Sequence, residues 1–120
     1  MSRDAGYLLD ILVEANLILE FTRGIDQSTF NADKLRQHGV ERSIEIIGEA
    51  VGRLSEEFKR QHPEISWRQM TGMRNILIHD YNNVKLKVVW EVVQVDVPFL
   101  VKQLEPLVPP DVDESIVPEG

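Results

Sequence analysis

The sequence has no cysteine among its 120 residues, which excludes disulfide bonds and thiolate-bound metals. A chain without cysteine suits a reducing cytoplasm. No run approaches the roughly 18 apolar residues that a membrane-spanning helix needs. The first apolar stretch carries Asp10 and Glu14, so the chain does not open with the pattern of a secretory signal peptide. We therefore expect a soluble, cytoplasmic protein that does not interact with membranes.

Sequence motifs that would indicate a bound nucleotide or metal are missing as well. Neither a phosphate-binding P-loop nor a GxGxxG pattern occurs among the seven glycines. No serine lies in the G-x-S-x-G motif of serine hydrolases, and no two histidines have the His-x-x-x-His spacing that suits zinc. The sequence predicts no cofactor and no metal ion.

Positive charge is scarce, because 13 Lys and Arg residues stand against 20 Asp and Glu residues and leave a formal net charge of −7. This balance argues mildly against a nucleic-acid partner, whose phosphates bind basic residues. Residues 111–120, however, carry four acids and no base. The rest of the chain has 13 basic and 16 acidic residues, a net charge of −3, so it can still form a local basic cleft. It could also bind a basic protein.

Apolar residues recur with the spacing of helices rather than of strands. The i, i+3, i+4, i+7 pattern of an amphipathic helix covers residues 4–22. After a connection over residues 24–31, a long helix is predicted over residues 32–61, ending before Pro63. Gly48 lies inside this helix, where glycine costs about 1 kcal/mol relative to alanine. Either another helix approaches closely at Gly48, or the position is simply not optimal.

Two further helices complete the predicted fold. One covers residues 67–79, and the other covers residues 84–107 with a kink or a new start at Pro98. We expect an all-α, antiparallel bundle of four to five helices over residues 1–108. Residues 109–120 are predicted to be an acidic, flexible C-terminal tail.

Five side chains able to carry charge or hydrogen bonds lie close together at the end of the third predicted helix. They are Arg74, Asn75, His79, Asp80 and Tyr81. A histidine can transfer a proton near neutral pH, and an arginine can hold a phosphate and stabilise charge on its oxygens. This set suits RNA cleavage without a metal, in which the ribose 2′-hydroxyl attacks the adjacent phosphate and leaves a 2′,3′-cyclic phosphate.

Simpler interpretations compete with this one. An arginine and a histidine five residues apart at a helix end more often form a capping or surface arrangement. The other two histidines, His38 in a polar stretch and His62 before a proline, suit solvated or helix-end positions. One motif therefore supports the RNA-cleavage interpretation only as a hypothesis, which the structure around the motif must test.

The geometry of a regular helix also restricts the pair. Five residues turn the chain by about 500°, so Arg74 and His79 point about 140° apart, whereas Arg74 and Tyr81 share a face. Two arrangements would solve this. The helix can end at His79 and leave its side chain free to turn, or two copies of the motif can line one cleft in a dimer.

The run from Arg74 to Tyr81 resembles the R-x4-H-x-Y motif of the HepT-like toxins (DUF86) in the HEPN superfamily. The likeness extends over about residues 4–107. The sequence Ile-Ile-Gly-Glu-Ala at residues 46–50 resembles a helix segment of that family. Residues 63–74 resemble its approach to the motif, and residues 89–98 resemble its last helix. The motif alone is weak, but the ordered set of similar segments is strong.

The resemblance implies a HEPN-type homodimer formed through the motif-bearing helices, and a toxin of a type VII toxin–antitoxin system. It assigns endoribonuclease activity on tRNA or mRNA to Arg74 and His79, with Asn75 assisting. The partner it implies is an MNT-type nucleotidyltransferase antitoxin, which attaches AMP to Tyr81 and so silences the toxin.

Asp80 and Glu49 are expected to support this site. The alternative hypothesis is a non-catalytic dimeric module that binds the nucleotidyltransferase, with Glu49 as a buried partner of Arg74. The replacement His79→Ala separates the two, because only the first loses RNA cleavage.

Overall fold

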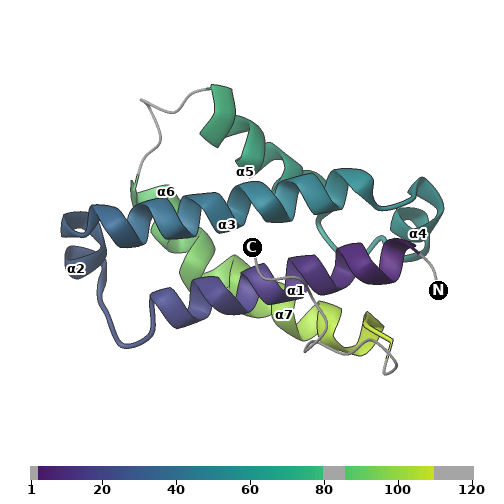
Figure 1. Cartoon of the computed structure of the whole chain (residues 1–120), viewed down its shortest axis with the longest axis horizontal. Helices are drawn as coiled ribbons and strands as arrows, with labels where there is room; N and C mark the ends of the chain where they lie inside the picture. Colours follow the sequence, from purple (N-terminus) through teal and green to yellow (C-terminus); the bar gives the residue numbers. More distant parts are fainter. Residues whose placement is uncertain (1–2, 80–85, 110–120) are drawn as a thin grey trace.

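The computed structural model describes residues 3–79 and 86–109, and every regular element among them is a helix (Figure 1). The expected all-α fold is confirmed. The bounds of the elements in chain order are α1 Arg3–Phe21, α2 Gln27–Ala32, α3 Lys34–Arg53, α4 Glu56–Gln61, α5 Trp67–His79, α6 Leu86–Glu91, the π-helical turn η2 Val92–Asp96, α7 Val97–Leu104 and the short 3-10 turn η3 Glu105–Leu107. No helix of this described part is long and apolar enough to cross a membrane.

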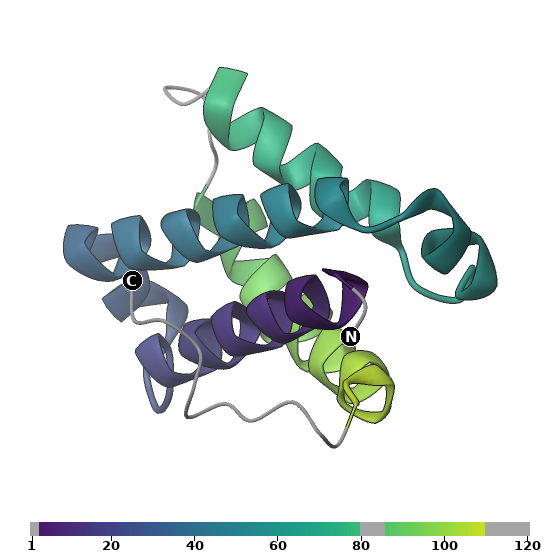
Figure 2. The same cartoon turned by 45° about the vertical axis from the view of Figure 1, so that its right-hand side comes forward.

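Helix α3 lies at the centre of the arrangement, between α1 and α5 in both views (Figures 1 and 2). Helices α1 and α3 pack side by side, and α7 packs against α1. The apolar stripe predicted for residues 4–22 is the buried face of α1. Side chains no more than 2% exposed form the centre of one core: Leu8, Ile11, Ala15, Ile18, Phe30, Val40, Val51, Val89, Val93 and Leu104.

The single long helix predicted over residues 32–61 is wrong, because the chain leaves the helical conformation at Leu54 and Ser55. The Ser55 hydroxyl accepts a hydrogen bond from Phe58 N and so starts α4. The Asp4 carboxylate accepts two further bonds, from Ser55 N at 2.8 Å and from Ser55 Oγ at 2.7 Å. These bonds replace the helical ones that the backbone loses, while Leu54 turns into the core with 3% exposure.

The last predicted helix, over residues 84–107, is interrupted just before Pro98, as the proline predicted. Proline has no N–H to donate and its ring would collide with the carbonyl four residues earlier. The π-helical turn η2 takes up the strain, and Val97 N donates to the carbonyl of Val92, five residues back. Helix α7 then begins at Val97, with the proline in its first turn. The predicted new start is confirmed. Apart from Pro109, the tail predicted over residues 109–120 lies outside the described residues.

Candidate functional site

Helix α5 carries Arg74, Asn75 and His79 of the motif and begins at Trp67, as the sequence predicted. Its first hydrogen bonds run from Gln69 N and Met70 N to the carbonyl of Ser66, and its last residue is His79. That the helix ends at His79 stays a prediction, because the residues that follow it lie outside the described part of the chain. The His79 side chain, Asp80 and Tyr81 lie outside what the structure describes, so their positions relative to Arg74 stay predictions.

Gly48 is the point at which α3 and α5 approach most tightly among the described glycines. A Cβ atom added to Gly48 would lie 2.4 Å from Cβ and 2.7 Å from Cδ of Arg74. Both distances are far below van der Waals contact, so no residue with a side chain fits here without movement of one helix. Of the two explanations left open for Gly48, close helix approach is confirmed. The glycine holds the aliphatic stem of Arg74 against the backbone of α3.

Within the described part of the chain, no ion pair or hydrogen bond holds the polar end of Arg74. Its Nε atom is buried, and within the described residues no hydrogen-bond partner reaches it. A buried donor without a partner typically costs about 1–3 kcal/mol, so such a group calls for a functional explanation. The pairing with Glu49 considered above is not present: Glu49 is half-buried, and neither an ion pair nor a hydrogen bond joins it to Arg74 in the described part of the chain.

Asn75, the next residue, points to a different surface. It is exposed and lines an open groove between α4 and α5 together with Arg68, Thr71 and Gly72 of its own helix. Three charged residues of α4 border the same groove: Glu56, Lys59 and Arg60. The structure therefore places Arg74 against α3 and Asn75 towards α4, with basic side chains on the Asn75 side.

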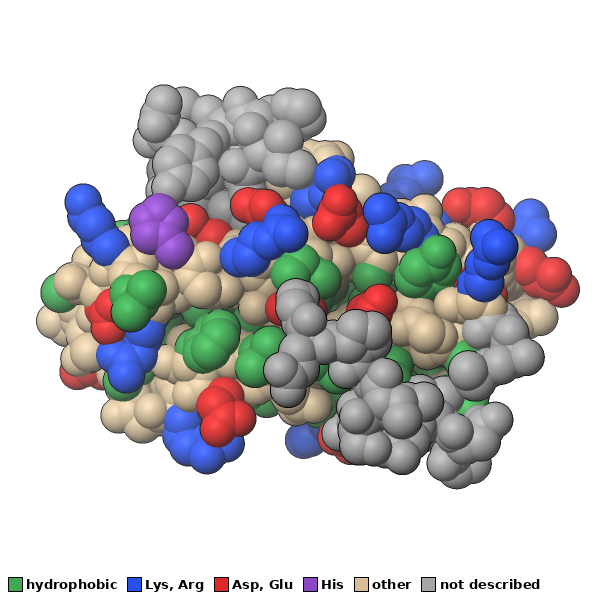
Figure 3. Space-filling model, in the orientation of Figure 1, with side chains coloured by type: hydrophobic (Ala, Val, Ile, Leu, Met, Phe, Trp, Pro, Cys, Tyr) green, Lys and Arg blue, Asp and Glu red, His purple; other side chains and the backbone are tan. Residues whose placement is uncertain are grey.

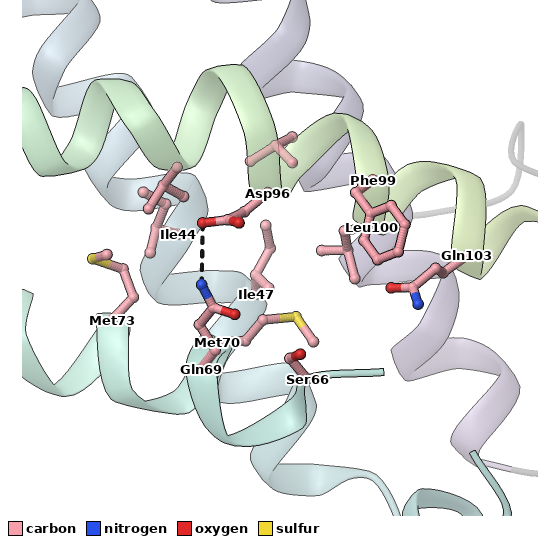
Figure 4. A pocket seen from close by; sticks show the side chains of 12 residues that line it. Ile44, Ile47, Ser66, Gln69, Met70, Met73, Asp96, Phe99, Leu100 and Gln103 are labelled. Atoms are coloured by element: carbon pink, nitrogen blue, oxygen red, sulfur yellow. Dashed lines mark hydrogen bonds between the residues drawn. The ribbon is translucent and has the colours of Figure 1, made fainter. Parts of the chain in front are cut away.

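A second groove, largely apolar, lies on the other side of α5 and faces η2 and α7 (Figure 4). Met70 and Met73 line it, and Gln69 Nε2 donates a hydrogen bond of 3.1 Å to Asp96 across it. Burial raises the pKa of the Asp96 carboxyl, and the charge of Glu91 raises it further. This pair ties α5 to η2. Sequence reasoning missed it because the two residues are 27 positions apart and share no motif.

The described residues show a mixed surface charge and no cluster of metal ligands. In the view of Figure 3, basic and acidic side chains are intermingled along α3 rather than gathered into one extended basic face. No group of three histidine, aspartate or glutamate side chains among the described residues could hold a metal ion. On the face that Figure 3 shows, positive charge is therefore not gathered into one extended patch.

Comparison with known proteins places the chain in one family. A family model described as ribonuclease HepT-like matches residues 11–107. A protein of Thermococcus cleftensis named "Probable ribonuclease HepT" is 48% identical over 101 residues, which cover 84% of this chain and 92% of that protein. A protein of Methanocaldococcus jannaschii named "Putative RNase MJ1380" is 40% identical over 100 residues, or 83% of this chain and 92% of that protein.

A third relative, "Putative RNase TTE0752" of Caldanaerobacter subterraneus subsp. tengcongensis, is 37% identical over 105 residues, or 88% of this chain and 94% of that protein. No solved structure matched the chain. The family model covers most of the helical bundle, and these relatives are covered over almost their whole length, so the resemblance inferred from the motif is confirmed. The chain belongs to the HepT-like family.

Proposed function

We propose that this protein is a metal-independent endoribonuclease in which Arg74 and His79 act on the scissile phosphate and Asn75 assists. The observation that carries the proposal is the state of Arg74. Its stem is fixed by close contact with Gly48, and its buried Nε has no partner among the described residues. A positioned donor without a protein acceptor is what a phosphate-binding arginine requires before substrate arrives. Relatives that are named as ribonucleases support the ribonuclease part of the proposal.

The chemistry needs only the side chains of the motif and the RNA itself. The 2′-oxygen forms a bond to phosphorus while the bond from phosphorus to the 5′-oxygen breaks. A base takes the 2′-hydroxyl proton and an acid supplies one to the leaving 5′-oxygen, and His79 can perform either step. The Arg74 guanidinium stabilises charge on the phosphate oxygens. The products are a 2′,3′-cyclic phosphate and a 5′-hydroxyl, and Asp80 and Glu49 have supporting roles only.

The proposed active form is a homodimer. One helix directs Arg74 and His79 about 140° apart, so two copies of α5 lining one cleft would supply a complete set of groups. An exposed apolar surface supports an association of this kind: Phe99 lines the groove beside α5, Val95 lies on the adjoining turn η2, and each is 60% exposed.

The first test is cleavage of purified RNA, in parallel, in MgCl₂ and in excess EDTA. We expect fragments in both, with rates within about two-fold, because proton transfer and phosphate binding by side chains need no metal. Fragment ends should be cyclic phosphates, detected by their resistance to phosphatase until acid opens the ring. The control is Arg74→Ala prepared in the same way, which should yield no fragments and so excludes a contaminating nuclease.

Loss of all cleavage in EDTA would contradict the metal-independent mechanism. Intact RNA under every condition would favour the non-catalytic dimeric module instead.

The proposed biological role is that of a cytoplasmic toxin acting on tRNA or mRNA, with an MNT-type nucleotidyltransferase as antitoxin. With that enzyme and ATP we expect the Tyr81 oxygen to form a bond to the α-phosphorus of ATP while pyrophosphate leaves. The modification should be seen as a mass increase by whole AMP units, together with loss of RNA cleavage. The added phosphate would repel RNA and its bulk would block the site. Tyr81→Phe should cleave RNA but remain unmodified and active, whereas Tyr7→Phe should be modified like the wild type. Modification of Tyr81→Phe would overturn the assignment.

A further inference from the structure

The groove between α4 and α5 combines positive charge with an open shape. Its volume is about 530 Å³, and its charged lining consists of Lys59, Arg60 and Arg68 against the single acid Glu56. This excess of base contrasts with the chain as a whole, whose net charge is −7. A local basic groove on an acidic protein attracts anions selectively to that place.

The three basic side chains of the groove differ in whether they already have an acidic partner. Lys59 Nζ lies 3.1 Å from Glu56 Oε1, and the Lys59 side chain is only 17% exposed, so its charge is partly used within α4. Arg60 and Arg68 are exposed, and none of the ion pairs or hydrogen bonds of the described residues involves them. Two such guanidinium groups, one on each wall, are well suited to hold phosphate oxygens.

The groove also reaches Asn75, one of the candidate catalytic residues. Arg68, Thr71, Gly72 and Asn75 are spaced i, i+3, i+4 and i+7, so they form one face of α5. Arg68 and Asn75 lie about 10 Å apart along the helix axis, and Asn75 adjoins Arg74 in the sequence. At Gly72 an added Cβ would meet no atom within 4 Å. A ligand can therefore lie along the helix backbone from Arg68 to Asn75, the motif residue that faces the groove.

We infer that this groove binds the phosphate backbone of the RNA next to the scissile bond, with Arg60 and Arg68 as positioning residues. The inference rests on the proposed ribonuclease function, which it extends to the path of the substrate. Two exposed arginines on opposite walls, along about 10 Å of helix, fit two neighbouring phosphates of a strand better than one mononucleotide. Backbone contacts of this kind position the strand without reading its sequence.

The test is binding of a fluorescent single-stranded RNA at several salt concentrations, measured with Arg60→Gln, Arg68→Gln and the double variant in a His79→Ala background that does not cut the probe. We expect each replacement to weaken binding by about five-fold. Log affinity falls as log salt rises, and the double variant should make this slope less steep by roughly 1.4. That is about 0.7 for each phosphate that an arginine no longer neutralises. The matched control is Arg23→Gln, which replaces an exposed arginine in the turn after α1.

A steric variant avoids any change of charge. Gly72→Leu would fill the groove at a position with room for a side chain, and should weaken RNA binding without lowering the melting temperature. With His79 restored, the double arginine variant should raise KM with little change in kcat. A structural role for the arginines would instead lower the melting temperature.

Each outcome has a defined meaning. An unchanged salt slope in the double variant, or an equally weakened affinity in Arg23→Gln, would overturn the groove assignment. Competition by AMP at concentrations that match the oligonucleotide would show a mononucleotide site and overturn it too. If the wild type binds through the groove but does not cleave, the ribonuclease proposal fails alone. If the wild type cleaves and the double variant keeps its KM, the groove fails alone.

Discussion

Replacing His79 with alanine is expected to lower kcat for RNA cleavage by about 10²–10⁴-fold, the usual contribution of a positioned acid or base. The reason is that the 2′-hydroxyl must lose a proton and the 5′-oxygen must gain one during the reaction. Among the motif side chains, only histidine exchanges protons readily near neutral pH. The measurement is single-turnover cleavage of a labelled RNA, with the melting temperature of the variant recorded beside it.

The matched control is His38→Ala. The His38 side chain is 60% exposed on α3, and its nearest acidic partner, Glu41, is 3.9 Å away. It should keep the wild-type rate. The same replacement of His79 in cells should remove any growth arrest that the wild type causes. A His79→Ala variant that cleaves RNA at the wild-type rate would show that another group transfers the proton.

Replacing Gly48 with alanine is expected to disturb both the fold and the site. The added methyl group would lie 2.4 Å from Arg74 Cβ and 2.7 Å from its Cδ, so α3 and α5 must move apart or Arg74 must leave its place. Such overpacking typically costs 1–3 kcal/mol, and the higher helix propensity of alanine returns up to about 1 kcal/mol. We expect a net loss of about 1–2 kcal/mol, and a loss of RNA cleavage larger than the fraction unfolded explains.

Gly52→Ala is the matched control, because Gly52 lies one turn further along the same helix and an added Cβ there meets no atom within 4 Å. It should raise stability by up to about 1 kcal/mol and leave cleavage unchanged. Urea denaturation of both variants, followed by circular dichroism, measures the difference. A Gly48→Ala protein as stable as Gly52→Ala would mean that the two helices do not meet as closely as the structure shows.

Local sequence signals predicted the helices wherever local forces alone decide them. The apolar spacing of α1 and the residues around α5 predicted those elements to within one or two residues, because helix periodicity and end signals act over a few positions. The break at Leu54 and Ser55 was not predicted. Part of its cause is the Asp4 carboxylate, which is 51 residues distant in the chain and only meets Ser55 after α1 has packed against α3.

For the candidate site too, local sequence signals predicted one part and the packing of helices decided the other. The sequence alone determined which chemistry is available: Arg74, Asn75 and His79 at the end of one helix, in a motif that also identified the family. Tertiary structure decided how those groups are presented. Gly48 in α3 holds the stem of Arg74, and α4 brings Arg60 and Lys59 opposite Arg68. Residue types and spacing along one helix are local properties, whereas the contact of two helices depends on how the whole core packs, which no short stretch of sequence encodes.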